Sequence, residues 1–179
     1  HDSNKPSSVQ MRGDNPSGQS EDGREEGAEV ESFTIDTFYN AVKFGVKSQV
    51  IKILEANREF VTTFDDKGFS AVHWAAKKGD VDMLNTLYTF GASLSVPTIG
   101  DAQMYPIHWA ASDGKISAIK FFMQKSQDIN VQDANGCTPV AVASQHNHTT
   151  CVVFLATNGA DLHLCDKNGD NPLHWAAYK

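Results

Sequence analysis

The sequence predicts an all-α solenoid of stacked helix-turn-helix units joined by hairpin connections. The tetrapeptide His-Trp-Ala-Ala occurs three times, at 73–76, 108–111 and 174–177, and weaker copies lie at 38–41 and 140–143. The aligned alanines fall at 41, 75, 110, 143 and 176, in steps of 34, 35, 33 and 33 residues. A constant period of this length is typical of repeat proteins, whose units bury their apolar faces only against one another.

The second unit shows the predicted elements most clearly. A turn at 65–68 precedes a short first helix at 70–78, for which Ser70 is a good N-cap. Gly79 ends this helix, because glycine adopts a left-handed backbone without strain. Apolar residues then recur at helical spacing from Val81 to Leu87, which predicts a longer second helix closing at 90–92.

The paired alanines let neighbouring first helices approach closely, while larger apolar residues on the second helices fill the space behind them. The third unit is longer than the others and carries Gln103 where glycine is usual, so we expect an irregular hairpin there. The first unit departs most from the pattern and is a candidate N-terminal cap. The predicted units span about 33–64, 65–98, 99–132, 133–165 and, in part, 166–179.

Residues 1–32 predict a disordered acidic tail, because they hold eight acidic and three basic residues and few large apolar groups. Such a tail is either a solvated linker or an acidic docking segment. Residues 33–179 hold fourteen acidic and twelve basic residues, so the repeats are nearly neutral and no basic patch suggests nucleic acid. No apolar run reaches the roughly 18 residues that a membrane span needs.

The three cysteines, Cys137, Cys151 and Cys165, are an odd count without a close pair. This usage fits a reducing cytoplasmic compartment better than a disulfide framework. We expect Cys151 to pack in the core, and Cys137 and Cys165 to be exposed in hairpins.

The repeated unit resembles the ankyrin repeat, whose pattern is roughly Asp-x-x-Gly-x-Thr-Pro-Leu-His-x-Ala-Ala-x-x-Gly. Residues 133–140 match its opening, and 166–177 match it nearly throughout. Gly91-Ala92 and residues 159–162 match its closing Gly-Ala-Asp-Val. The resemblance covers 33–179 and implies a binding scaffold whose partners are proteins, with extended peptide segments favoured.

A narrower resemblance is to the cytosolic ankyrin arm of DHHC-type protein S-acyltransferases, the palmitoyltransferases. It lies in the repeated His-Trp-Ala-Ala, the long third connection (93–104) and the final Pro-Leu-His-Trp-Ala-Ala-Tyr-Lys. In that family the arm precedes membrane helices and a catalytic domain with an Asp-His-His-Cys motif, which these 179 residues lack. Because Lys179 ends the first helix of a fifth unit, we expect the natural protein to continue.

Two functions therefore stay open. The favoured one is substrate recruitment for a membrane palmitoyltransferase, which would place the segment in the cytoplasm at an internal membrane such as the Golgi. The alternative is a soluble cytosolic adaptor or scaffold with no enzymatic domain. In either case we expect a monomer with no cofactor, no catalytic residue and no required membrane contact.

The repeated histidines are expected to be structural. His73, His108 and His174 lie one and two further units apart, too far for one metal ion. The resemblance implies that each fixes its turn by local hydrogen bonds. His146 and His148 lack an evident third ligand, so no metal site is expected. The glycines with a predicted structural role are Gly68, Gly79, Gly136 and Gly169.

The resemblance implies that partners bind the hairpin tips and the exposed ends of the first helices. Phe69 and Met104 would be apolar anchors beside charged residues. Trp109 matches a tryptophan that the acyltransferase relatives use for recruitment, while Lys78 stands where they use an asparagine. The complete set of candidate partner-binding residues is Trp109, Lys78, Lys77, Phe69, Met104, Ser112, Asp113, Gln145 and His146.

Overall fold

The computed structural model describes residues 32–178, so nearly all of the predicted acidic tail, and Lys179, lie outside the described residues. The predicted all-α fold is confirmed, since the only β-type pairing in the described part is an isolated bridge between Phe64 and Ser70. The elements are α1 (Ile35–Phe44), α2 (Lys47–Ala56), the 3-10 helix η1 (Arg58–Thr62), α3 (Ala71–Lys78), α4 (Val81–Thr89), α5 (Pro106–Ser112), α6 (Ile116–Gln124), α7 (Pro139–Gln145), α8 (Thr149–Thr157) and α9 (Pro172–Ala177).

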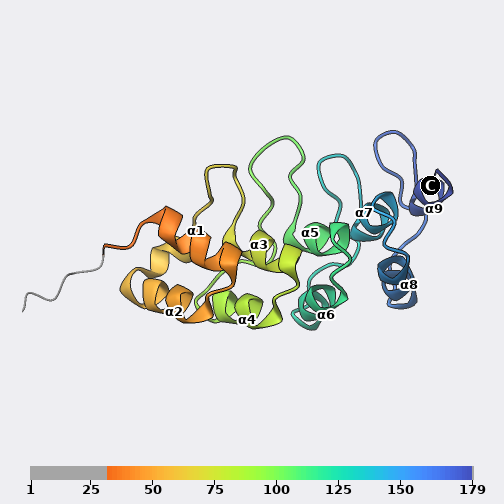
Figure 1. Cartoon of the computed structure of the whole chain (residues 1–179). Helices are drawn as coiled ribbons and strands as arrows, with labels where there is room; N and C mark the ends of the chain where they lie inside the picture. The colour runs from red at the N-terminus through yellow and green to blue at the C-terminus, as the bar shows by residue number, and fades with distance from the viewer. Residues whose placement is uncertain (1–31, 179) are drawn as a thin grey trace, which may run out of the picture. The chain divides into compact units, whose positions relative to one another are not determined.

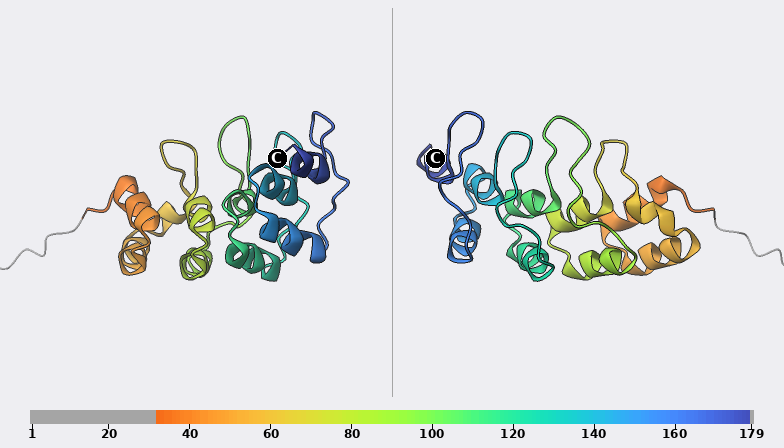
Figure 2. Two further views of the ribbon diagram at one scale, coloured as in Figure 1. Left: turned by 45° about the vertical axis from the view of Figure 1, so that its right-hand side comes forward. Right: turned by 180° about the vertical axis from the view of Figure 1, so that it is seen from behind.

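The helices of residues 32–178 form two rows (Figure 1). The first row holds α1, α3, α5, α7 and α9, and the second holds α2, α4, α6 and α8. Each first-row helix packs on the next one along the row, and the connections between units project beside this row in both views of Figure 2. The hairpins and the ends of the first helices therefore lie on one side of the stack.

Packing between the rows follows the pattern predicted for small and large residues. Ala75 and Ala76 on α3 are fully buried, as are Ala110 and Ala111 on α5. The second row fills the space behind them with larger side chains. The fully buried ones include Leu84, Leu87, Ile119, Phe122 and Leu155.

The predicted ends of the elements in the second unit are confirmed. Helix α3 has Ser70 as its N-cap and Gly79 as its C-cap in the left-handed conformation. Helix α4 ends at Thr89, with Phe90 as the C-cap. The hairpin of the third unit is irregular as expected, since Gln103 adopts a positive φ of 43° where glycine would be unstrained.

The His73 ring joins two units. Its Nδ1 lies 3.2 Å from the Ser70 backbone nitrogen and 2.8 Å from the Ser70 hydroxyl, and its Nε2 lies 2.9 Å from the carbonyl oxygen of Met104. A carbonyl can only accept, so Nε2 carries the proton and Nδ1 accepts from the Ser70 N–H. The local bond is the one that the resemblance to the ankyrin repeat implied, and the structure adds the bond to the next hairpin.

The His108 ring repeats this arrangement one unit further along. Its Nδ1 accepts from the Tyr105 N–H at 3.1 Å, and its Nε2–H donates to the Cys137 carbonyl at 2.9 Å. His174 makes the local bond, accepting from the Asn171 N–H at 3.2 Å. In the first unit the hydroxyl of Tyr39 takes the histidine's place and donates to the Thr63 carbonyl at 2.5 Å.

Burial keeps both bridging histidines neutral. Loss of solvent lowers the pKa of His73 to about 4, although the bond to Met104 opposes this effect. Burial also lowers the pKa of His108, against the influence of Asp133 and of its own backbone bonds. A proton added to Nδ1 would face the backbone N–H that this nitrogen accepts in the neutral ring, so protonation would break that local bond.

We predict that the domain loses stability as the pH falls from about 6.5 to about 4. In this window the unfolded histidines bind protons while folded His73 does not, so His73 alone costs about 3 kcal/mol of unfolding free energy. Urea unfolding followed by circular dichroism at several pH values measures this slope. His73→Gln should remove its share of the slope, and exposed His174→Gln should keep it. A slope unchanged by His73→Gln would contradict the assignment.

Two glycines provide a matched test of hairpin packing. Gly68, Gly79, Gly136 and Gly169 all have positive φ. A Cβ on Gly68 would lie 2.8 Å from Ile99 Cβ and from the Ile99 carbonyl oxygen, whereas a Cβ on Gly169 meets nothing within 4 Å. Gly68→Ala should therefore cost about 1–3 kcal/mol more unfolding free energy than Gly169→Ala. Equal losses in urea titrations would show that the two hairpins do not pack as described.

Candidate protein-binding face

An aspartate shapes three of the hairpins on this face. Asp65 Oδ1 accepts the backbone N–H groups of Lys67 and Phe69, at 3.1 and 2.9 Å. Asp133 Oδ1 does the same for the residues two and four positions after it, and so does Asp166 Oδ1. One carboxylate oxygen per hairpin is therefore used inside the turn, which leaves the second oxygen for other partners.

The second oxygen holds a tryptophan in two of these hairpins. Trp74 Nε1 donates to Asp65 Oδ2 at 2.9 Å, and Trp175 Nε1 donates to Asp166 Oδ2 at 3.1 Å. Lys43 Nζ lies 3.2 Å from the same Asp65 oxygen and 4.6 Å from the centre of a Trp74 ring. Both indoles are partly buried and tied to their hairpins.

These contacts set the charge state of Asp65. Desolvation works to raise the pKa of this carboxyl, but hydrogen bonds from the Phe69 N–H, the Trp74 indole and Lys43 outweigh it. The pKa of Asp65 therefore lies below its usual range. The carboxylate stays ionised and holds Trp74 and Lys43 together on the face.

Trp109 is held differently from the other two tryptophans. Gly100 stands where the hairpin aspartate would be, and the Trp109 indole N–H has no hydrogen-bond partner among residues 32–178. Its ring instead packs edge-on against Phe69, with centroids 4.5 Å apart, and against Trp74 at 5.6 Å. Lys77 Nζ lies 5.6 Å from the ring centroid. The half-buried indole thus keeps a free donor.

An open hollow lies beside this aromatic cluster. Lys78 Nζ donates to the Lys43 carbonyl at 2.9 Å across the neighbouring first helices, and Asp113 Oδ2 is buried without a hydrogen-bond partner in the described part of the chain. Lys43 is paired with Asp65, and the three other lysines around one carboxylate favour an acidic ligand. The residues that line this hollow are Lys43, Trp74, Lys77, Lys78, Asp113 and Lys115.

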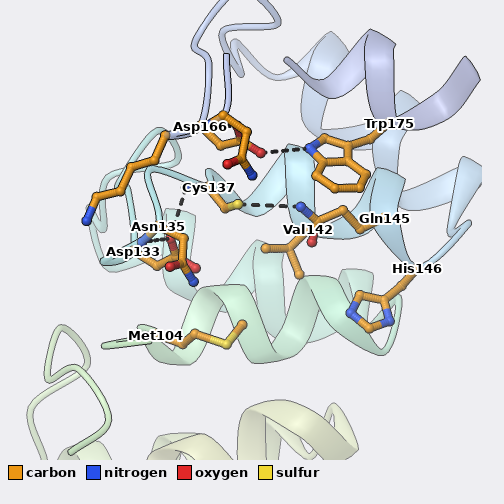
Figure 3. Close-up of a pocket in the computed structure, with 11 residues that line it drawn as sticks. Met104, Asp133, Asn135, Cys137, Val142, Gln145, His146, Asp166 and Trp175 are labelled. Atoms are coloured by element: carbon orange, nitrogen blue, oxygen red, sulfur yellow. Dashed lines mark hydrogen bonds between the residues drawn. The ribbon is translucent and has the colours of Figure 1, made fainter. Parts of the chain in front are cut away.

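A second hollow, of about 460 Å³, lies one to two units further along (Figure 3). It contains the predicted residues Met104, Gln145 and His146, which therefore lie apart from the Trp109 cluster. Its lining is Met104, Asp133, Asn135, Cys137, Val142, Gln145, His146, Asp166, Lys167, Asn168 and Trp175.

Ser112 belongs to neither hollow. Its hydroxyl donates to the Trp109 carbonyl at 2.9 Å, and its own carbonyl accepts from His148 Nε2 at 2.8 Å. The roles of Asp65, Asp133 and Lys43 were not predicted from the sequence. A usable signal was present, because each hairpin aspartate stands five residues before the N-cap of the following helix.

The expectation that Cys137 is exposed was wrong. Cys137 is buried in a cluster with Ala141 and Val142 of α7, and its Sγ accepts from Gln145 Nε2 at 3.4 Å. Burial raises the pKa of the Cys137 thiol, and it raises that of Cys151, which lies in the core as expected, to about 11. Cys165 is exposed as expected.

Within residues 32–178 no group of three or more His, Cys, Asp or Glu side chains is placed to hold a metal ion. The described helices are also all too short or too polar to cross a membrane.

Comparison with known protein families identifies the repeat. The family model described as ankyrin repeats in three copies matches residues 107–179, and the single ankyrin repeat matches residues 67–99. Together these matches cover more than half of the chain.

Three proteins similar to this chain are named as two acyltransferases and a cation channel. "Probable protein S-acyltransferase 23" of Arabidopsis thaliana is 32% identical over 150 residues, 83% of this chain and 28% of that protein. Palmitoyltransferase AKR1 of Lachancea kluyveri is 29% identical over 113 residues, 60% of this chain and 15% of that protein. The transient receptor potential cation channel subfamily A member 1 of Homo sapiens is 32% identical over 123 residues, 67% of this chain and 11% of the channel. The chain thus spans less than a third of each relative.

The different anchoring of the two tryptophans predicts different costs of substitution. Trp74→Phe removes the donor to ionised Asp65 and should lower the unfolding free energy by about 1–2 kcal/mol. Trp109→Phe breaks no hydrogen bond within residues 32–178 and should cost less. Urea titration of both variants measures the difference, and a larger loss for Trp109→Phe would contradict it.

Proposed function

The chain belongs to the ankyrin-repeat family, and we propose that it binds an extended peptide of a partner protein on the face around Trp109. Repeats of this kind are protein-binding scaffolds, whose stacked units present a continuous surface. The observation that carries the proposal is the Trp109 indole, which is fixed by neighbouring rings yet keeps an unpartnered N–H.

Trp109 has the features of an interface anchor. Tryptophan is among the residues that contribute most to binding energy at protein interfaces. Phe69 and Trp74 hold its ring in position, so little side-chain entropy would be lost on binding. A carbonyl or side-chain oxygen of the peptide would accept from its free N–H.

The lysines beside Trp109 define the rest of the peptide. Lys77 lies over the Trp109 ring, and Lys78 and Lys115 line the adjoining hollow. These ammonium groups complement acidic side chains. The ligand is therefore an extended segment with an apolar residue for the Phe69–Trp109 cluster and acidic residues for the lysines.

The finer proposal is that this peptide belongs to a substrate of a membrane palmitoyltransferase. Two similar proteins are named as an S-acyltransferase and a palmitoyltransferase, which supports this assignment. A recruited peptide would keep a target cysteine at high local concentration near a distant active site. The domain would then work on the cytoplasmic side of an internal membrane such as the Golgi.

The second candidate function is a cytosolic adaptor or scaffold without an enzymatic domain. The similarity to a cation channel at equal identity favours keeping it, because related repeats also occur in a protein whose name carries no acyltransferase activity. Both candidates share the peptide-binding face, and they differ in the rest of the protein.

Selection from a peptide library displayed on phage tests the peptide-binding face. We expect enrichment of segments with apolar and acidic residues, and an affinity at least roughly tenfold weaker for Trp109→Ala and for Lys78→Ala. The matched control is Val153→Ala, which removes an exposed apolar side chain from α8 in the second row. Binding unchanged by both face variants would place the partner site elsewhere.

Acylation assays on the full-length protein test the recruitment role. Trp109→Ala should slow acylation of a protein that carries a selected peptide, while acylation of the same protein without that peptide stays unchanged. A full-length sequence without an Asp-His-His-Cys motif would rule out recruitment and favour the adaptor.

A further inference from the structure

The fourth unit lacks the tryptophan that fills the same place in the second and fifth units. Val142 stands one residue before Ala143, in the register of Trp74 before Ala75 and of Trp175 before Ala176. Val142 lines the hollow of about 460 Å³ described above, in which Trp175 forms another wall (Figure 3). The smaller side chain therefore leaves open a space that an indole occupies elsewhere in the stack.

Asp133 in this hollow lacks both donors that its counterpart Asp65 has. Asp65 Oδ2 accepts from Trp74 Nε1 and pairs with Lys43 Nζ. The corresponding positions for Asp133 are Val142 on α7, which has no side-chain donor, and Ser112 on α5, whose hydroxyl donates to the Trp109 carbonyl instead. Its Oδ1 holds the turn, but its Oδ2 has no hydrogen-bond or ion-pair partner within residues 32–178.

The remaining walls favour a cation with a long apolar stem. Met104 and Val142 are apolar, and Trp175 presents an indole that Asp166 already fixes through its N–H. Two carboxylates, Asp133 and Asp166, line the hollow beside one lysine, Lys167. A carboxylate oxygen without a partner next to an indole is a favourable place for a cationic donor.

We propose that this hollow, the Val142 pocket, receives an arginine side chain of a partner protein. The planar guanidinium offers several N–H donors, so one group replaces both the indole N–H and the ammonium that Asp65 has. Its flat face packs on Trp175, and its methylene stem covers Met104 and Val142. A lysine side chain supplies the charge but lacks a planar group that could pack on Trp175. The pocket is separate from the Trp109 cluster and does not depend on the function proposed for that cluster.

NMR titration of the ¹⁵N-labelled chain with the peptide acetyl-Gly-Arg-Gly-amide tests the pocket. The Trp175 indole N–H and the Val142 amide should shift and saturate. Matched peptides carry citrulline, which is the neutral isostere, or lysine in place of arginine. Each should bind at least roughly tenfold more weakly than the arginine peptide. Citrulline lacks the positive charge, and lysine lacks the planar guanidinium with its several N–H donors.

Two variants complete the test. Asp133→Asn keeps the Oδ1 acceptor of the turn and removes the charge, so it should weaken the arginine peptide roughly tenfold or more. Val142→Trp should fill the pocket and abolish the response, with circular dichroism to verify folding. Trp109→Ala should leave the response unchanged, which separates this pocket from the other site. Equal binding of citrulline or lysine peptides, or full binding by Asp133→Asn, would overturn the proposal.

Discussion

The His73 ring lies between two units and hydrogen-bonds to both, and the rest of the face depends on this bond and its copy at His108. Each ring accepts from the start of its own first helix and donates to the carbonyl just before the next one. Because the neutral ring with the proton on Nε2 is the form that satisfies both neighbours, burial and tautomer are fixed together.

The hairpin aspartates use that fixed frame to place side chains on the surface. One oxygen closes the turn, and the other holds an indole at Asp65 and Asp166. The units differ in whether they have both the hairpin aspartate and the tryptophan that it holds. Trp109 has an indole without the aspartate, and Asp133 has the carboxylate without the indole. In both units a polar group on this face has no hydrogen-bond partner within residues 32–178, and both proposed binding sites rest on these two groups.

Local features of the sequence predicted the fold well, because a repeat brings each element into contact with near neighbours in the chain. The period, the buried alanines, the Ser70 and Gly79 caps and the strained Gln103 hairpin all follow from residues a few positions apart. The second bond of each histidine joins residues 29 or 31 positions apart, and the burial of Cys137 depends on how its hairpin packs, so neither followed from spacing alone. The separation of Met104, Gln145 and His146 from Trp109 required the same three-dimensional information.

The most direct test of this arrangement is the protonation state of the two ring nitrogens, observed by long-range ¹H–¹⁵N NMR on histidine-labelled protein. At about pH 7 the rings of His73 and His108 should both be neutral with the proton on Nε2, because burial lowers the pKa of each. At about pH 5.5, below the usual histidine pKa but above the value of about 4 for His73, the His73 ring should remain in that form. Signals of a charged ring, or of two tautomers in exchange, at either residue would show that the units are not joined by these bonds.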